Sequence, residues 1–324
     1  MSVATRAIGR KLPGNVKETR AMEAIVIAGP TAGGKSGLAM ALARRHGGTI
    51  VNADSMQVYE GLHILTARPG EAQMGEVPHR LYGHVPSEES YSVGAWYRDA
   101  QVVLADLRTA GRIPIVVGGT GLYLKALTGG LSAMPPIPTE LREVLRGRLK
   151  SEGPEALHRE LAREDPQAAA GLDPADGQRI VRALEVVRAT GRSIASFRAE
   201  AGSPLVDPAR TRRILVLPER TRLRAMIASR FRAMMEAGAM QEVAQLRSRR
   251  LSQDLPVMKA IGVRELSAVL DGRMSPGEAE ERAVTASRQY AKRQTTWFRN
   301  QLPDGWEVFE EASAALEPGI VRVD

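Results

Sequence analysis

The sequence predicts an α/β protein in which helices flank a parallel sheet and a helical insertion domain interrupts the chain. Short apolar runs of strand length alternate with segments of helical spacing, a pattern typical of parallel sheets. A glycine-rich turn directly follows the first apolar run, and residues 139–200 contain no convincing strand. The length of 324 residues fits roughly one to two domains, and an apolar fraction of 43% can supply a core.

The first strand is expected at residues 23–28 (EAIVIA), a short apolar run that ends at the turn beginning with Gly29. Residues 36–46 have helical spacing and are followed by two glycines, a common end to a helix. Residues 49–53 (TIVNA) predict a second strand. This order of strand, helix and strand is the repeating unit of a parallel sheet.

The same pattern continues until a proline-rich stretch. Residues 97–110 predict a helix, and residues 113–117 predict a third strand that runs into Gly118 and Gly119. Prolines at 135–138 end the alternation, and the polar helical residues after them predict the insertion. Residues 212–217 (RRILVL) then predict a strand that returns to the main sheet, and residues 219–300 are again helical.

These boundaries divide the chain by charge as well as by structure. The total net charge is +8, but residues 205–301 alone carry +9, residues 1–21 carry +4 and residues 302–324 carry −5. We expect a flexible basic arm at 1–21, a core formed by 22–138 and 205–301, the insertion at 139–204 and a peripheral acidic tail at 302–324. The late basic block suits a polyanionic partner such as nucleic acid, although a solvated Arg-rich helical surface explains it equally well.

Composition excludes several classes of protein. The chain has no Cys, which removes disulfides, Cys-ligated zinc and thiol nucleophiles, and it fits a reducing compartment such as the cytoplasm. No apolar run reaches the ~18 residues of a membrane span. We therefore expect a cytoplasmic protein without a membrane partner.

The sharpest motif is GPTAGGKS, which fits the phosphate-binding pattern G-x-x-x-x-G-K-[ST] between a predicted strand and a predicted helix. Backbone N–H groups and the helix N-terminus would bind phosphate oxygens, Lys35 would add a positive charge and the Ser36 hydroxyl could ligate Mg²⁺. The core is therefore expected to be P-loop NTPase-like, with a diphosphate or triphosphate ligand. The residues of this cradle are Gly29, Pro30, Thr31, Ala32, Gly33, Gly34, Lys35 and Ser36.

Two further features follow strands whose carboxyl ends should share one edge of the sheet. Asp54 ends the second strand, where it could hold Mg²⁺ through water or act as a base. The simpler interpretation is that Asp54 is only a turn residue. The GGTG turn after the third strand would bring backbone N–H groups and the Thr120 hydroxyl to the same ligand. An ordinary tight turn explains this glycine pair equally well.

The late basic block combines cations and aromatic residues. Arg288, Lys292 and Arg299 share roughly one helical face, and Trp297 and Phe298 lie beside them. Aromatic side chains next to a cationic stripe can stack on unpaired bases. The alternative is that the aromatic residues belong to the core and the charges only solvate the helix.

Taken together, these segments resemble the tRNA dimethylallyltransferase (tRNA isopentenyltransferase) family over nearly all of residues 23–300. The last stretch is the most specific, because generic P-loop kinases have nothing like it. The stretches that carry the resemblance are GPTAGGKS (29–36), NADSMQVY (52–59), GGTGLYLKAL (118–127), DGQRIVRALEVVRATG (176–191) and SRQYAKRQTTWFR (287–299).

The resemblance implies a reaction, its substrates and a cofactor. Family members move the dimethylallyl group of dimethylallyl diphosphate to N6 of the adenosine immediately 3′ of the anticodon in tRNA, and release pyrophosphate with Mg²⁺ present. The cradle would then hold pyrophosphate as a leaving group, and the insertion would clasp the anticodon stem-loop. The family also implies a monomer, and the absence of Cys matches the bacterial type, which has no zinc finger.

The resemblance also implies roles for individual residues. Asp54 would be the general base and Thr120 would orient the adenine. Arg220 and Arg230 match the arginines on the diphosphate side, with Arg230 the better match for a pyrophosphate contact. The positions that match segments touching tRNA are Asp54, Ser55, Met56, Gln57, Thr120, Arg142, Gln178, Arg179, Ile180, Val181, Arg182, Lys259, Arg264, Lys292, Arg293 and Arg299.

The chain departs from the family pattern at several positions outside the cradle. The family usually has Gly and Lys where this chain has Leu65 and Arg68, and an Asp near Gly83. It also commonly has Asn, Arg and Tyr at the positions of Ala175, Met226 and Val263. These departures concern the surroundings of the site and some tRNA contacts, and they leave Asp54 and Thr120 in place.

Three other functions remain open from the residues. The P-loop alone is compatible with a small-molecule or nucleotide kinase, although no convincing lid segment is visible. A nucleic-acid-binding ATPase without transferase activity would also combine a P-loop with a basic block. A prenyltransferase acting on free adenylates would use the same cradle, and the helical insertion favours tRNA over that alternative.

Overall fold

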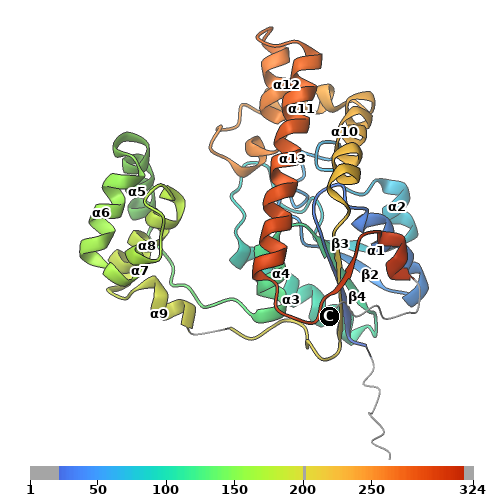
Figure 1. The fold of residues 1–324 in the computed structure, drawn as a ribbon, viewed down its shortest axis with the longest axis horizontal. Coiled ribbons are helices and arrows are strands. Elements are labelled where there is room, and N and C mark those ends of the chain that lie inside the picture. The colour runs from blue at the N-terminus through green and yellow to red at the C-terminus, as the bar shows by residue number, and fades with distance from the viewer. Residues whose placement is uncertain (1–21, 200–201, 317–324) are drawn as a thin grey trace, which may run out of the picture.

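A central parallel sheet organises the protein, in a computed structural model that describes residues 22–199 and 202–316 (Figure 1). Within these ranges, no helix has both the length and the apolar content needed to cross a membrane. The six strands lie in the order β3-β2-β4-β1-β5-β6 and all pair in parallel. The strands are β1 (Ala24–Ala28), β2 (Thr49–Asn52), β3 (His79–Arg80), β4 (Pro114–Gly118), β5 (Thr211–Val216) and β6 (Glu307–Phe309).

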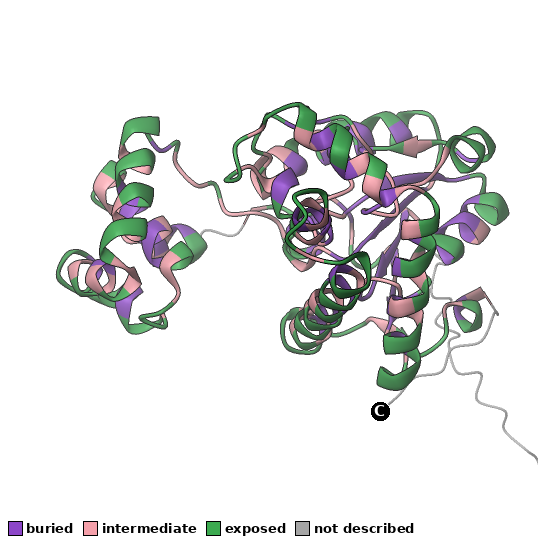
Figure 2. Ribbon diagram, turned by 90° about the horizontal axis from the view of Figure 1, so that it is seen from above, coloured by how far each residue is buried: buried purple, intermediate pink, exposed green. Residues whose placement is uncertain are grey.

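Helices cover both faces of this sheet, as Figure 2 shows by the buried strands between exposed helices. On one face, α1 (Lys35–His46) and the short η2 (Ala312–Leu316) form a hydrophobic cluster with the strands. On the other, α3 (Val93–Thr109), α4 (Gly121–Gly129) and the end of α13 (Pro276–Gln301) form a second cluster. Because both faces are buried, the central strands β1 and β4 are continuous apolar runs.

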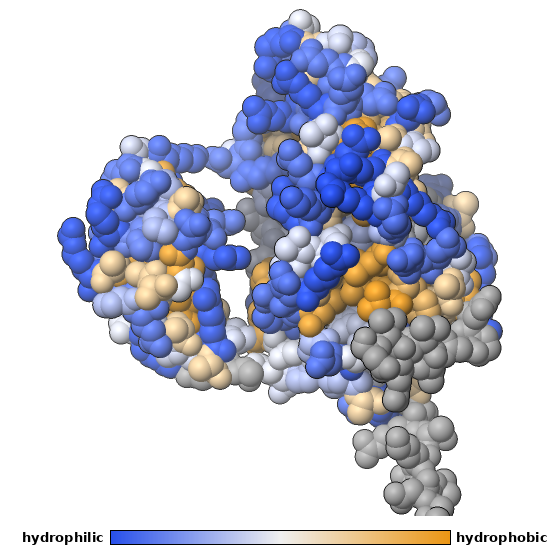
Figure 3. All heavy atoms as spheres, viewed as in Figure 1, coloured by the Kyte–Doolittle hydropathy of each residue, from blue (hydrophilic) through white to orange (hydrophobic). Residues whose placement is uncertain are grey.

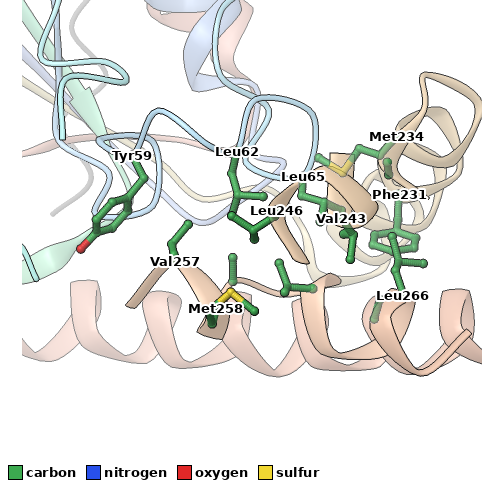
Figure 4. Close-up of a cluster of buried hydrophobic side chains, with 14 of the residues drawn as sticks. Tyr59, Leu62, Leu65, Phe231, Met234, Val243, Leu246, Val257, Met258 and Leu266 are labelled. Atoms are coloured by element: carbon green, nitrogen blue, oxygen red, sulfur yellow. The ribbon is translucent and has the colours of Figure 1, made fainter. Parts of the chain in front are cut away.

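A third hydrophobic cluster supports the carboxyl edge of the sheet. Here the segment after β2 packs against the helices that follow β5, as Figure 4 shows for Leu62 beside Leu246 and Leu65 beside Val243. This packing fixes the chain just beyond Asp54. The elements of this region are α10 (Arg220–Glu236), α11 (Ala239–Ser248), η1 (Pro256–Lys259), α12 (Val263–Leu270) and the first half of α13. The short α2 (Glu71–Glu76) is not part of this cluster, and its Glu76 forms an ion pair with Arg44 of α1.

The helical insertion is a separate lobe with its own core, drawn in green to yellow in Figure 1. Besides the chain segments at its base, the exposed ion pair between Lys150 Nζ and Asp254 Oδ2, 2.8 Å apart, joins it to the segment after α11. Exposed ion pairs of this kind stabilise weakly. The lobe contains α5 (Thr139–Glu152), α6 (Pro154–Glu164), α7 (Pro166–Ala170), α8 (Gly177–Thr190) and α9 (Ile194–Ala199).

We expect the Leu145→Ala substitution to destabilise the lobe by about 2–4 kcal/mol, because Leu145 is fully buried in its core. The core of the lobe is separate from those around the sheet, so calorimetry should show an earlier transition for the lobe and an unchanged one for the sheet. Val144→Ala is the control, since Val144 is 57% exposed. A single transition that shifts as a whole would contradict an independent lobe.

The strands expected at 23–28, 49–53, 113–117 and 212–217 are confirmed as β1, β2, β4 and β5. The helix expected at 97–110 begins earlier, at Val93, because the Ser92 hydroxyl accepts a hydrogen bond of 3.2 Å from the backbone N–H of Ala95. The sequence reading missed α2 and β3, which are too short to show a periodic pattern.

The acidic tail expected to be peripheral contributes to the sheet instead. β6 pairs with β5, and Arg212 and Glu307 form an ion pair of 2.9 Å across this pairing. Ala315 in η2 is fully buried against α1. The prediction for the tail is therefore wrong for residues 307–316, while residues 317–324 and the predicted arm at 1–21 lie outside the described residues.

Candidate active site

The loop between β1 and α1 has the geometry of an anion-binding cradle. Gly29 has a φ of 153°, and a Cβ there would lie 2.4 Å from the carbonyl oxygen of Val216, so glycine is required. Gly34 has a φ of 84° and forms the N-cap of α1, where it has no side chain to occupy the first N–H groups of the helix. These N–H groups and the helix dipole favour a phosphate group at this position.

Lys35 supplies the positive charge of the cradle. Its Nζ donates a hydrogen bond of 2.6 Å to the carbonyl oxygen of Pro30. Burial lowers the pKa of Lys35 to about 8, the negative charge of Asp54 opposes this effect and the positive charge of Arg230 adds to it. The proton of Lys35 is therefore held less firmly than in water, and a bound anion would stabilise the charged form.

Arg230 completes the positive side of the site. Its guanidinium donates a hydrogen bond to the Thr31 hydroxyl, and burial lowers its pKa while the charge of Asp54 raises it. Arg230 also lines a cavity of about 290 Å³ together with Lys35 and Ser36. Arg220, the other arginine implied by the resemblance, is exposed at the first residue of α10 and lies outside this lining.

The structure brings Asp54 and Thr120 together at the carboxyl ends of the neighbouring strands β2 and β4. Asp54 Oδ1 accepts a hydrogen bond of 2.9 Å from the backbone N–H of Met56. Thr120 Oγ1 accepts one of 2.9 Å from the N–H of Ser55, which immediately follows Asp54. The turn after β2 is therefore fixed to the turn after β4, as expected for residues at one edge of the sheet.

Three tyrosines lie close enough to Asp54 to feel its charge. Burial raises the pKa values of Tyr82, Tyr123 and Tyr290, and the negative charge of Asp54 raises each of them further. Tyr290 also forms a hydrogen bond with Thr120. The carboxylate of Asp54, which is itself partly exposed, thus has three neutral tyrosines in its neighbourhood, of which Tyr123 is buried.

Sequence reasoning did not assign roles to Tyr82, Tyr123 or Gln294. Gln294 is buried, and its side-chain amide contacts the cradle at Thr31 and the second glycine turn at Gly119. The only sequence signal for Gln294 is its place in the stretch 287–299, which carries the family resemblance. Its hydrogen-bond partners lie far away in the chain, so no local pattern indicates them.

The residues expected to touch tRNA occupy several parts of the molecule. On α13, Lys292 and Arg293 are exposed and line a hollow of about 500 Å³ with Trp297. Beside Asp54, Met56 packs against the third cluster, and Gln57 Nε2 donates a hydrogen bond of 2.8 Å to the Thr66 carbonyl oxygen. Also exposed are Lys259 at the end of η1, Arg264 on α12 and Arg299 on α13.

A further region is the helical lobe. Ile180 is fully buried and Val181 is 5% exposed, because the side chains of both residues face the core of the lobe and not its surface. The polar residues of the same set lie nearer the surface. Gln178 and Arg179 are exposed, and Arg182 and Arg142 approach the buried carboxylate of Glu185 to 3.0 Å and 3.8 Å.

Hydrophilic side chains border the opening between the lobe and the rest of the molecule, as Figure 3 shows. On the other side of this opening stands α13, with its exposed Lys292 and Arg293. A basic helix facing a polar lobe suits a polyanionic ligand bound between them.

Two of the departures from the family pattern compensate for each other. A Cβ on Gly83 would lie 1.9 Å from Arg68 Nη1, so the arginine occupies the space of a side chain at residue 83. The same Nη1 donates a hydrogen bond of 2.9 Å to the carbonyl oxygen of Tyr59. Leu65 similarly packs beneath Gly262, whose Cβ would lie 2.7 Å from Leu65 Cδ2. Arg68 and Leu65 thus fill the space beside Gly83 and Gly262.

The fold and the site define a P-loop protein in which an anion-binding cradle and the carboxylate of Asp54 lie at one edge of a parallel sheet. The chain belongs to the IPP transferase family, whose model matches residues 57–301, and the isopentenyl transferase model matches residues 22–84.

Similar proteins support this assignment. The tRNA dimethylallyltransferase of Rhizobium leguminosarum bv. trifolii (strain WSM2304) is 59% identical over 286 residues, which are 88% of this chain and 96% of that protein. The one from Rhizobium meliloti (strain 1021) is 55% identical over 295 residues, 91% of this chain and 97% of that protein.

Solved structures agree with the fold. The tRNA isopentenylpyrophosphate transferase of Bacillus halodurans superimposes with a TM-score of 0.62 and 35% identity, covering 88% of this chain and 90% of that chain. A eukaryotic dimethylallyltransferase acting on tRNA gives a TM-score of 0.74 and 29% identity, covering 86% of this chain and 70% of that chain.

Proposed function

We propose that the protein transfers the dimethylallyl group of dimethylallyl diphosphate to N6 of the adenosine immediately 3′ of the anticodon in tRNA, and releases pyrophosphate. The observation that carries this proposal is the hydrogen-bonded link between the two halves of the site, in which Gln294 contacts Thr31 of the cradle and Gly119 of the turn that carries Thr120. The negative charge of Asp54 also opposes the burial that lowers the pKa values of Lys35 and Arg230, so the proton acceptor and the diphosphate cradle belong to one cluster. The dimethylallyl diphosphate in the cradle and the adenosine beside Asp54 would therefore meet at this cluster.

The residues of the cradle would support departure of the diphosphate. As the bond between the allylic carbon and the diphosphate oxygen breaks, negative charge grows on pyrophosphate, and Lys35, Arg230 and the N–H groups of α1 would neutralise it. The electron pair leaves with pyrophosphate, and the allylic carbon can tolerate the positive charge that develops on it.

Mg²⁺ fits the same cradle. The Ser36 hydroxyl lines the cavity beside Lys35, and Mg²⁺ commonly combines one or two protein oxygens with diphosphate oxygens and water. Within the described residues, no group of three or more His, Cys, Asp or Glu could hold a metal. We therefore propose Ser36 as the protein ligand, and the ion would contribute charge neutralisation to the leaving group.

The acceptor side would activate the adenine amine. Its lone pair is conjugated with the ring and attacks weakly, so Asp54 would accept the N6 proton as the new carbon–nitrogen bond forms. Thr120, fixed by Ser55 and Tyr290, would orient the base. The neutral tyrosines would exclude water that otherwise competes for the allylic carbon.

We place the anticodon stem-loop between α13 and the helical lobe. The target base would leave its stack to reach Asp54, which costs a few kcal/mol. The lobe would clasp the stem through its exposed polar residues, including Gln178 and Arg179. We propose that one monomer acts on one tRNA in the cytoplasm, where tRNA is found.

The test is an incubation with Mg²⁺, dimethylallyl diphosphate and unmodified tRNA that has adenosine at the required position. Mass spectrometry should detect N6-isopentenyladenosine in the tRNA. Parallel reactions with AMP, ADP and ATP as acceptors separate an adenylate prenyltransferase, and ATP turnover stimulated by a metabolite would indicate a kinase. Product in either parallel reaction and none in tRNA would refute the proposal.

We expect the Arg293→Ala substitution to weaken tRNA binding and to reduce the log–log salt slope by about one unit, because a phosphate contact is lost. Arg293 is exposed on α13. Binding should be measured by filter retention between low and moderate salt. Arg112→Ala is the matched control, since Arg112 is exposed before β4, at the opposite edge of the sheet. Equal slopes for both variants would remove Arg293 from the interface.

A further inference from the structure

Gln294 lies between the two glycine turns of the site. Its side chain is on α13, and the residue is 6% exposed. Oε1 accepts a hydrogen bond of 2.8 Å from the backbone N–H of Thr31, and Nε2 donates one of 2.8 Å to the carbonyl oxygen of Gly119. A primary amide is the group that satisfies a donor on one side and an acceptor on the other, so these contacts also fix its orientation.

The two turns are in close contact at this point. A Cβ on Gly119 would lie 2.3 Å from Gln294 Nε2 and 3.3 Å from the carbonyl oxygen of Gly29. The second turn therefore approaches both the start of the cradle and the amide of Gln294. A larger residue at 119 would displace one of them.

The contact face of α13 extends along the helix on both sides of Gln294. Tyr290, four residues earlier, forms a hydrogen bond with Thr120. Trp297, three residues later, packs against Gly121, whose Cβ would lie 2.3 Å from the indole ring. Residues at this spacing share one face of a helix. Lys292 and Arg293 are exposed on the same helix.

Thr31 is held from two sides. Gln294 binds its backbone N–H, and Arg230 of α10 donates to its hydroxyl. The conformation of the cradle therefore depends on helices that come from the far end of the chain. In the proposed function, the cradle holds the donor and the Gly119 turn carries Thr120, which holds the acceptor.

We propose that Gln294 is a positioning residue that holds the donor loop at Thr31 and the acceptor loop at Gly119 in the separation and orientation needed for transfer. The assignment of donor and acceptor rests on the proposed function. The two hydrogen bonds of Gln294 act before the transfer reaction, because they hold the two loops in the conformation that binds the ligands. Gln294 itself touches neither reacting group.

The first test is Gln294→Met, which keeps the length of the side chain and removes both hydrogen bonds. We expect transfer at saturating substrates to slow by on the order of 10- to 100-fold, since a misplacement of about 1 Å has effects of this size. Affinity for Mg²⁺-pyrophosphate should fall several-fold, and tRNA affinity should stay within about twofold. Gln245→Met on α11, where Gln245 is exposed, is the matched control.

The second test is Gln294→Glu, which separates the two hydrogen bonds. An ionised carboxylate still accepts from Thr31 N–H but repels the Gly119 carbonyl oxygen, and protonation restores the donor. Pyrophosphate affinity relative to the unaltered protein should therefore improve as pH falls from 8.5 to 6. Both proteins contain the other titratable groups near the site, which are Lys35, Arg230, Asp54 and Tyr290. The ratio of the two pyrophosphate affinities therefore reports on the charge of residue 294.

The outcomes separate this inference from the proposed function. The positioning role would be overturned if Gln294→Met transfers the dimethylallyl group and binds pyrophosphate as well as the unaltered protein. It would also be overturned if the loss of pyrophosphate affinity in Gln294→Glu is independent of pH. If Gln294→Met does not fold, the pH response of Gln294→Glu decides. Absence of transfer by the unaltered protein would refute the function alone, because the pyrophosphate measurements need no prenyl transfer.

Discussion

The Asp54→Asn variant should transfer the dimethylallyl group at least about 10³-fold more slowly than the unaltered protein, within the range for loss of a general base. Asparagine keeps the oxygen that accepts the N–H of Met56, so the turn should stay intact. It removes the proton acceptor and the negative charge that opposes the low pKa of Lys35. The measurement is a single-turnover rate with saturating donor and tRNA.

Binding distinguishes a base from a structural residue at position 54. We expect the tRNA dissociation constant of Asp54→Asn to stay within a few fold. Asp106→Asn on α3 is the matched control, because Asp106 is 59% exposed and its nearest cation, Arg80, is 3.8 Å away. A loss of tRNA affinity as large as the loss of rate would argue against proton transfer by Asp54.

The Lys35→Met variant should lose most of its affinity for the diphosphate. A hydrogen bond to a charged group contributes about 1.5–3 kcal/mol, which corresponds to roughly 10- to 150-fold in affinity. Titration calorimetry with Mg²⁺-pyrophosphate measures this loss. Lys125→Met on α4 is the matched control, since Lys125 is exposed.

The pH dependence of the same binding provides a second check on Lys35. Its pKa is lowered to about 8, so the charged form predominates below that pH and is lost above it in the unliganded protein. Pyrophosphate affinity should therefore decline as pH rises beyond about 8, and Lys35→Met should not show this decline. An affinity that is flat up to pH 10 in the unaltered protein would contradict a buried, titrating lysine.

Local patterns were enough to predict the parts of the site that lie on single segments. GPTAGGKS identified the cradle, and Asp54 and Thr120 could be placed because the carboxyl ends of parallel strands meet at one edge. Arg230 came from the resemblance alone. Its position beside Thr31 depends on how α10 packs against α13 and α11 beyond the carboxyl edge of the sheet, which no local pattern gives.

The remaining features depend on contacts between distant segments. Gln294 and Gly119 are 175 residues apart, so a polar residue in a helix gave no sign of the turn it would bind. β6 has three residues, too few for a strand pattern. Ile180 and Val181 were placed at a surface by the resemblance, although their apolar spacing with Ala183 and Leu184 indicates a core face.

The close fit of α13 against the turn after β4 restricts how this protein can change over evolutionary time. Residues 119 and 121 have no room for a side chain while Gln294 and Trp297 keep their size. A larger residue at position 119 or 121 requires a smaller one at position 294 or 297. These two segments should therefore accept substitutions only in matched pairs, and libraries that randomise one of them alone should return almost entirely the parental residues.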